Sequence, residues 1–296
     1  FENFFSVNGP YDYVLNLSAV KHVRSERDPF SIMRMIDVNI INTINTLKIS
    51  AKYNTKKYFC VSTDKATYPI NMMGASKRIM ENFLQYQNHK INISTTRFAN
   101  VAFSDGSLLY GFKNRFEKKQ PIVAPKDVKR YFLTPEESGQ LCLLSCLLGK
   151  NNQIFYPIIN NNLELISFSK IAENFILQYG YKPYHCNSEE QAKNKINELI
   201  KGGKWACYFF ESDTTGEKYY EEFYEEIDLI DEKTFKNIGI VNNTQTSIKD
   251  FEFFLSKINK IKSSNKWCKE ELVDLFKMML PEFIHEEKNK NLDQKM

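Results

Sequence analysis

The sequence contains no long apolar run, and neither sign of charge dominates it. No stretch approaches the roughly 18 consecutive apolar residues of a membrane helix, and no signal peptide is expected before the fold. Lys and Arg number 40 against 36 Asp and Glu, which gives a net charge of +4. Because the basic residues are scattered along the chain, nucleic acid is not expected as a partner. These absences predict a soluble, cytoplasmic protein without a membrane segment.

Paired cysteines are also missing. The chain has 6 cysteines, none of them in a C-x-x-C pair, and most lie within apolar runs. We therefore expect core thiols in a reducing compartment rather than disulfides. His22 has no second histidine or cysteine at the spacing that metal ligands need, so no metal site is expected.

Short apolar segments alternate with helical patterns over the first hundred residues. The strand-like runs are Tyr11–Leu17, Lys57–Ser62 and Ile91–Phe98. Asp28 followed by Pro29 is a typical helix start between the first two runs. A hydrophobic content of 42% is ample for a sizeable core. Strands that alternate with helices predict an α/β fold with a doubly wound parallel sheet.

Polar residues follow the second of these strands directly, and they include Thr63, Asp64 and Lys65. A helix is predicted next, with Asn71 as its N-cap and Met73 on one of its faces. In parallel α/β sheets, ligands bind at the carboxyl ends of the strands, so the three polar residues are candidate site residues. Taken alone, an Asp-Lys pair after a strand is more often a solvated turn.

Three blocks together resemble the extended short-chain dehydrogenase/reductases. They are Asn16–Val23 (NLSAVKHV), Ser62–Lys77 (STDKATYPINMMGASK) and Arg97–Ser107 (RFANVAFSDGS), with weaker echoes at Arg130–Thr134 and Thr215–Phe223. More narrowly, the blocks look like the nucleotide-sugar 4,6-dehydratases of bacterial polysaccharide biosynthesis that act on UDP-N-acetylglucosamine. The resemblance covers most of the chain from residue 11 to residue 223.

The resemblance implies a division of the chain. Residues 1–105 correspond to the remainder of an NAD-binding Rossmann domain, and residues 285–296 are a charged tail. Residues 106–284 mainly form a smaller substrate-binding lobe, with some elements returning to the sheet. Within that lobe the sequence predicts one strand over Lys126–Thr134, and the polar stretch Lys182–Lys204 reads as a surface insertion.

Two departures from the family pattern matter. The family's Rossmann domain opens with a G-x-G-x-x-G turn, and no such glycine cluster precedes Tyr11. From the size of βαβ units, roughly 70 residues would be missing, so we expect a fragment without the N-terminal strands. The wider superfamily uses a Tyr-x-x-x-Lys pair, whereas Met73 stands at the tyrosine position before Lys77. A subgroup of the sugar dehydratases resembles this chain in carrying Met there beside Thr-Asp-Lys.

The resemblance implies roles for individual residues. The catalytic residues expected are Thr63, Asp64, Lys65 and Lys77. Asp64 would give a proton to the departing hydroxyl, and Lys65 would remove a proton as the base. NAD is the expected cofactor, in contact with Ser18, Ala19, Lys21, Ser62, Lys77 and Asn100. A UDP-sugar is the expected substrate, in contact with Lys21, His22, Asn100, Ser107 and Arg130.

Simpler structural roles stand beside these expectations. Ser18 would merely end a strand, Asn100 would cap a loop, and Arg130 would form a surface salt bridge instead of clamping a diphosphate. Lys21 and His22 would face solvent. A homo-oligomer is also expected from the resemblance.

Two other functions stay open. A 4-epimerase or reductase acting on a related nucleotide sugar relies on the tyrosine, so an Asp64-Lys65 pair without a tyrosine at position 73 argues against it. A catalytically silent nucleotide-sugar-binding subunit is favoured by Met73 and by the missing glycine turn. The intact Thr63-Asp64-Lys65 triplet opposes that interpretation.

Overall fold

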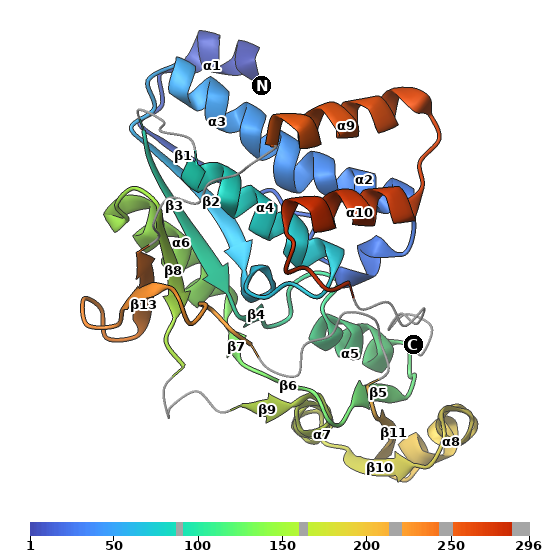
Figure 1. Ribbon diagram of the computed structural model, residues 1–296. Coiled ribbons are helices and arrows are strands. Elements are labelled where there is room, and N and C mark those ends of the chain that lie inside the picture. The colour runs from blue at the N-terminus through green and yellow to red at the C-terminus, as the bar shows by residue number, and fades with distance from the viewer. Residues whose placement is uncertain (87–90, 160–164, 213–220, 243–250, 286–296) are drawn as a thin grey trace.

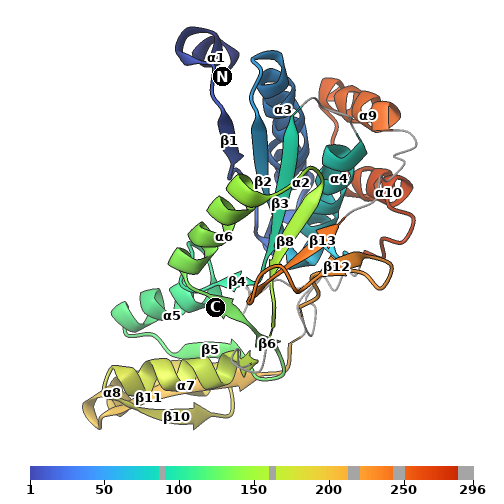
Figure 2. The ribbon, with the colours of Figure 1, turned by 90° about the vertical axis from the view of Figure 1, so that its left-hand side faces the viewer.

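A six-stranded sheet forms the centre of the fold (Figures 1 and 2). The structure is a computed structural model that describes residues 1–86, 91–159, 165–212, 221–242 and 251–285. The strand order is β1-β2-β3-β8-β13-β12. The bounds are Tyr13–Asn16 for β1, Lys57–Thr63 for β2, Asn92–Phe98 for β3, Gln153–Pro157 for β8, Leu229–Asp231 for β12 and Ile238–Asn242 for β13. From β1 to β8 the strands run parallel, and β13 and β12 add antiparallel pairs.

The predicted parallel strands are confirmed as neighbours. Tyr58 of β2 aligns with Val14 of β1 on one side and with Ile93 of β3 on the other. Helices cover both faces of this sheet (Figure 2), and the middle of β2, from Tyr58 to Val61, is apolar because both faces of the sheet are covered there. Tyr58 and Cys60 join the core on one face, while Phe59 packs with the cysteines of helix α6 on the other. The doubly wound α/β fold is therefore shown.

The helices that flank the sheet begin where local sequence signals place them. Their bounds are Pro29–Ile36 for α2, Asn42–Lys52 for α3, Met72–Tyr86 for α4 and Pro135–Leu148 for α6. The Asp28 carboxylate accepts the Ser31 N–H at 2.9 Å, and the Asn71 side chain accepts the Gly74 N–H at 2.7 Å. Both predicted N-caps are therefore present, and the second one fixes the start of α4.

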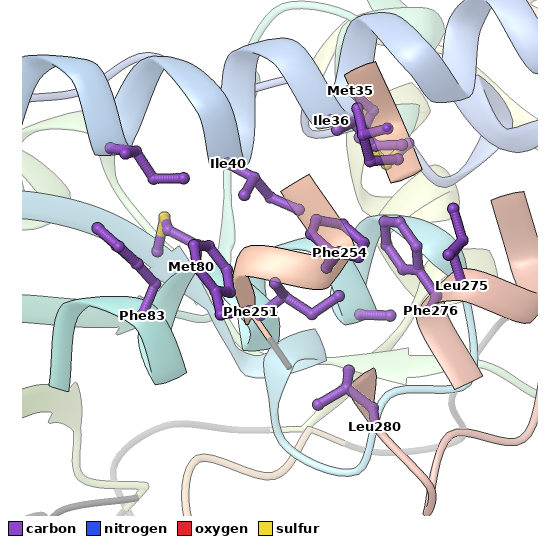
Figure 3. Close-up of a cluster of buried hydrophobic side chains, with 14 of the residues drawn as sticks. Met35, Ile36, Ile40, Met80, Phe83, Phe251, Phe254, Leu275, Phe276 and Leu280 are labelled. Carbon is purple, nitrogen blue, oxygen red and sulfur yellow. The ribbon is translucent and has the colours of Figure 1, made fainter. Parts of the chain in front are cut away.

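Two C-terminal helices pack on the helices of the first hundred residues (Figure 3). They are α9 (Phe251–Ser264) and α10 (Lys269–Met279). Phe254 and Phe276 have no exposed surface, and the ring of Phe251 stacks on Phe83 of α4 at 4.9 Å. The pair thus covers α2 and α4 and closes the largest apolar core, although both helices lie within the range assigned mainly to the substrate lobe.

A second, smaller sheet has the order β10-β11-β5, and all of its strands are parallel. Its strands are β5 (Ile122–Pro125), β10 (Lys182–Cys186) and β11 (Lys204–Phe210), and its helices are α5 (Leu108–Glu117), α7 (Phe168–Gln178) and α8 (Glu189–Lys201). The interpretation of Lys182–Lys204 as a surface insertion is therefore wrong. The stretch is polar because β10 is an edge strand and α8 buries only Ala192 and Ile196.

Two short ladders connect the sheets. The single strand expected over Lys126–Thr134 is divided into β6 (Lys129–Arg130) and β7 (Phe132–Leu133), so that expectation is wrong. The two pieces pair with different partners, β6 with β9 (Ile166–Ser167) and β7 with β4 (Asn100–Val101). The switch of partner places Phe132 beside Asn100, at the carboxyl end of the main sheet. Within the described ranges, no helix combines the length and apolar character that a membrane crossing requires.

Candidate active site

A cavity of about 410 Å³ opens at the carboxyl ends of β2 and β3. Its wall is built by the segment after β1, the end of β2, helix α4, the residues after β3, and the start of α5. All but two of the residues singled out in the sequence line it. Those that do are Ala19, Lys21, His22, Ser62, Thr63, Asp64, Lys65, Met73, Lys77, Asn100 and Ser107. The topology therefore gathers side chains that are up to eighty-eight positions apart in the sequence.

Thr63, Asp64 and Lys65 form a tight local unit at the end of β2. The Thr63 hydroxyl donates to Asp64 Oδ1 at 2.9 Å, and Lys65 Nζ lies 3.1 Å from the same oxygen and 3.3 Å from Oδ2. The Asp64 side chain is 3% exposed, whereas that of Lys65 is 19% exposed. The Thr63 hydroxyl and the Lys65 ammonium thus hold the buried Asp64 carboxylate in place, and Lys65 also lines the cavity.

The backbone of helix α4 lies close to the backbone of this unit, at Gly74 and Lys65. A Cβ on Gly74 would lie 2.1 Å from the Lys65 carbonyl oxygen and 2.9 Å from its carbon. Only glycine permits that approach, because backbone atoms cannot move aside as a side chain can. Met73, the next residue toward the N-terminus, is buried and lines the cavity where the superfamily has its tyrosine. A thioether has no proton to transfer, so Met73 contributes shape and apolar surface.

Lys77 lies one turn further along α4 and is 2% exposed. Its Nζ donates to the carbonyl of Val61 at 2.9 Å, which fixes the amine at the inner wall of the cavity. Burial lowers the pKa of Lys77, and the nearby Cys60 and Glu81 only partly oppose this effect. An amine with a lowered pKa loses its proton more easily, so Lys77 suits the role of a base as well as that of a hydrogen-bond donor.

Lys21, which is basic, and Ser107, which is neutral, also line the cavity. Burial lowers the pKa of Lys21, and the charge of Asp105 partly opposes the shift. Ser107 caps helix α5, because its hydroxyl accepts the N–H of Tyr110 at 3.2 Å. Ser107 therefore has a structural task in addition to facing the cavity.

Two predicted contacts lie elsewhere. Ser18 lines a separate recess beside β1, and its N–H donates to the Asn16 side chain at 3.2 Å. Its neighbours on either side, Leu17 and Ala19, line the main cavity instead. Arg130 is 3% exposed and does not line the cavity. Its Nη1 donates to the carbonyl of Lys129 at 2.8 Å, and the clamp on a diphosphate stays a prediction.

A buried ion pair beneath the site has no counterpart in the sequence analysis. Arg97 Nη2 lies 2.8 Å from Glu81 Oε2, and neither side chain has any exposed surface. The hydroxyl of Ser62 donates to the other oxygen of Glu81. Burial alone would raise the pKa of Glu81, but the charge and hydrogen bonds of Arg97 outweigh it and lower the pKa. The pair ties α4 to β2 and β3 directly behind the cavity.

Glu221 is a second residue that the sequence analysis did not single out. It is 8% exposed, and its charge interacts with those of Asp64 and Lys65. The Glu217 and Lys218 positions of the same block lie outside the described residues. Across the described part of the chain, no group of at least three His, Cys, Asp or Glu side chains is arranged to hold a metal ion.

Comparisons with known sequences give one matching family and several relatives. The family described as "Polysaccharide biosynthesis protein" matches residues 3–243. An uncharacterized membrane protein of Methanocaldococcus jannaschii is 31% identical over 179 residues, which are 58% of this chain and 53% of that protein. The capsular polysaccharide biosynthesis protein CapD of Staphylococcus aureus is 29% identical over 230 residues, 76% of this chain and 34% of its own length. The chain thus spans about half of the first relative and about a third of the second.

Solved structures show the same fold at low sequence identity. Pen from Bacillus thuringiensis has a TM-score of 0.63 at 21% identity and covers 89% of this chain and 79% of its own. A double mutant of DesIV, a dTDP-glucose 4,6-dehydratase from Streptomyces venezuelae with NAD and DAU bound, has a TM-score of 0.53 at 13% identity. The match covers 72% of this chain and 64% of that protein. Since the family match extends over most of the sequence, the chain belongs to the polysaccharide biosynthesis protein family.

Proposed function

We propose that this chain carries the catalytic site of a nucleotide-sugar 4,6-dehydratase that acts on UDP-N-acetylglucosamine. The observation that carries the proposal is the buried Asp64 carboxylate, paired at 3.1 Å with the partly exposed Lys65 at the wall of a cavity. A dehydratase needs an acid and a base close together, because it removes a proton and a hydroxyl from adjacent carbons. CapD is named for capsular polysaccharide biosynthesis, which supports the same substrate class.

The chain's own residues divide the proton transfers. Lys65 first passes a proton to the Asp64 carboxylate across their contact, Asp64 then gives it to the departing C6 hydroxyl, and Thr63 orients the carboxyl group. Lys65 takes the proton from C5, which is acidic beside a ketone at C4. Lys77, whose pKa is lowered by burial, helps to remove the proton of the C4 hydroxyl, a step that Met73 cannot perform.

The cofactor that this chemistry requires is NAD. When bound, NAD would supply hydride transfer, with removal of a hydride at C4 of the sugar and its return at C6. The residues described fit its nicotinamide end, since the buried Lys77 amine and the apolar Met73 lie together at the inner wall of the cavity. For the pyrophosphate end the sequence holds no G-x-G-x-x-G turn. Lys77 and Asn100 would therefore bind the ribose and amide portions of the cofactor.

A 4-epimerase is the second candidate, and relatives favour it. The UDP-glucose 4-epimerase of Rickettsia canadensis is 27% identical over 247 residues, 78% of this chain and 71% of its own length. An epimerase keeps the C6 hydroxyl, so it has no use for an acid at that carbon. The Asp64-Lys65 pair therefore favours dehydration over epimerisation.

The identity of the product decides between these candidates. The protein is incubated with NAD and UDP-N-acetylglucosamine in deuterated water, and the products are analysed by NMR and mass spectrometry. Dehydration yields a 4-keto-6-deoxy sugar with solvent deuterium at C5. A 4-epimer without deuterium would establish the epimerase, and binding of the UDP-sugar without turnover would establish a silent binding subunit.

A further inference from the structure

Glu221 joins two strands that border the cavity. Its Oε2 accepts the N–H of Tyr131 at 2.8 Å, and its Oε1 accepts the N–H of Asn100 at 3.3 Å. Asn100 begins β4, and Tyr131 precedes β7, the partner of β4 in the short ladder. Both oxygens of one buried carboxylate thus hold backbone groups at the wall of the site, with Asn100 itself lining the cavity.

The segment that carries Glu221 is fixed along its length. It runs from residue 221 to residue 228 and connects the smaller sheet to β12 of the main sheet. Three further contacts anchor it, from Arg97 to the carbonyl of Phe223 at 2.6 Å, from Arg78 to Glu225 at 2.7 Å, and from the N–H of Glu226 to the hydroxyl of Tyr68 at 3.2 Å. These three contacts therefore hold the segment that places Glu221 beside the site.

Charged groups surround the carboxylate of Glu221. Asp64 and Lys65 face it from the end of β2, and Arg130 faces it from β6. Burial raises the pKa of Glu221 to about 7, and the charge of Asp64 adds to the rise. Lys65, the N–H of Tyr131 and Arg130 oppose the shift without cancelling it.

We propose that Glu221 is a positioning residue of this site, which aligns Asn100 and Tyr131 at the cavity wall beside the Asp64-Lys65 pair. This role rests on the proposed dehydration. A carboxylate can accept both backbone N–H groups at once, and each of its two oxygens does so. Glu221 touches neither substrate nor cofactor in this role, because it does not line the cavity.

The test compares three variants of the protein. Glu221→Gln removes the charge and keeps the shape, while Glu221→Asp keeps the charge on a shorter side chain. Glu211→Gln is the matched control, since that carboxylate is 67% exposed and pairs with Lys126 on the smaller sheet. Two quantities are measured for each variant, the pH dependence of kcat/KM for dehydration and the midpoint of thermal unfolding.

For Glu221→Gln we expect kcat to fall about 10-fold with KM nearly unchanged, which corresponds to roughly 1.4 kcal/mol of the barrier, because an amide cannot accept both backbone N–H groups. The limb of the kcat/KM profile near pH 7 should disappear together with the carboxyl group that titrates there. Glu221→Asp should restore the pH profile, and Glu211→Gln should match the unaltered protein. A residue that only supports the fold would lower the unfolding midpoint and leave the pH profile in place.

Two outcomes separate the failures. If Glu221→Gln keeps the kcat and the pH profile of the unaltered protein, the positioning role is wrong. If the unaltered protein forms no 4-keto product, the proposed function is wrong, and the positioning role falls with it. Should Glu221→Gln fail to fold, the pH profile of Glu221→Asp decides, and a profile that lacks the limb near pH 7 would contradict the role.

Discussion

Gly74 shows how one residue can place the proposed catalytic pair, Asp64 and Lys65. Its missing side chain lets α4 touch the backbone of Lys65, where an added Cβ would lie 2.1 Å from the carbonyl oxygen. We predict that Gly74→Ala destabilises the fold by about 1–3 kcal/mol, the usual cost of overpacking, and lowers activity by displacing the Asp64-Lys65 segment. Chemical denaturation and steady-state kinetics measure the two effects.

The control for this substitution is Gly139→Ala in helix α6. Nothing lies within 4 Å of a Cβ at that position. Alanine should therefore stabilise the helix by about 0.5–1 kcal/mol without a change in activity. Equal effects of the two substitutions would show that the close approach at Gly74 does not position the site.

Glu221 also makes a prediction about stability. Its pKa is about 7 in the folded protein and 4.5 as the ordinary value, so between these pH values the folded state keeps a proton that the unfolded state has released. The contribution to stability is therefore complete below about pH 4.5 and is lost as the pH rises toward 7, at most about 1.4 kcal/mol per pH unit. Denaturation from pH 4.5 to 8 should show this slope in the unaltered protein relative to Glu221→Gln. Parallel stability curves for the two proteins would contradict the raised pKa.

At the scale of elements, the C-terminal pair α9 and α10 supports the helix that carries Lys77. Phe254 of α9 is fully buried in that core, whereas the adjacent Phe253 is 47% exposed. We predict that Phe254→Ala lowers the free energy of unfolding by about 3–5 kcal/mol. Phe253→Ala should cost less than about 1 kcal/mol, since its ring mainly meets Lys257. Similar losses for both variants, measured by denaturation, would mean that α9 does not brace α4.

The elements that could be predicted are those with local signals. Asp28 and Asn71 mark helix starts, because the side chain of each accepts the backbone N–H of the residue three positions further along the chain. The apolar run of β2 identifies a strand buried on both faces. The stretch Lys182–Lys204 could not be assigned in this way, because an edge strand and a helix with a narrow buried stripe look polar throughout. Which ladder β6 and β7 would join depends on distant partners, and no local pattern encodes that choice.

At the scale of the whole molecule, the site combines local and distant contributions. The Thr63-Asp64-Lys65 unit could be placed at a strand end because parallel sheets bind ligands there. Glu221 could not, since it lies 121 positions from Asn100, whose N–H it accepts. The inward turn of Arg130 and the turn of Ser18 away from the cavity also depend on tertiary packing. The residues that line the cavity at the end of β2 could thus be predicted from the sequence. Which of the more distant residues also reach the cavity depends on the tertiary fold.

The most direct test of the account is the loss of activity on Asp64→Asn, with Met73→Ala as the matched change in the same cavity. Asparagine cannot donate the proton that the departing C6 hydroxyl requires, so formation of the 4-keto-6-deoxy product should fall by about 10²- to 10⁴-fold while the fold is retained. Met73→Ala should cost mainly packing, since sulfur has no proton to move. The account would be contradicted if Asp64→Asn left the rate unchanged while Met73→Tyr raised it, because the chemistry would then belong to a tyrosine-based mechanism.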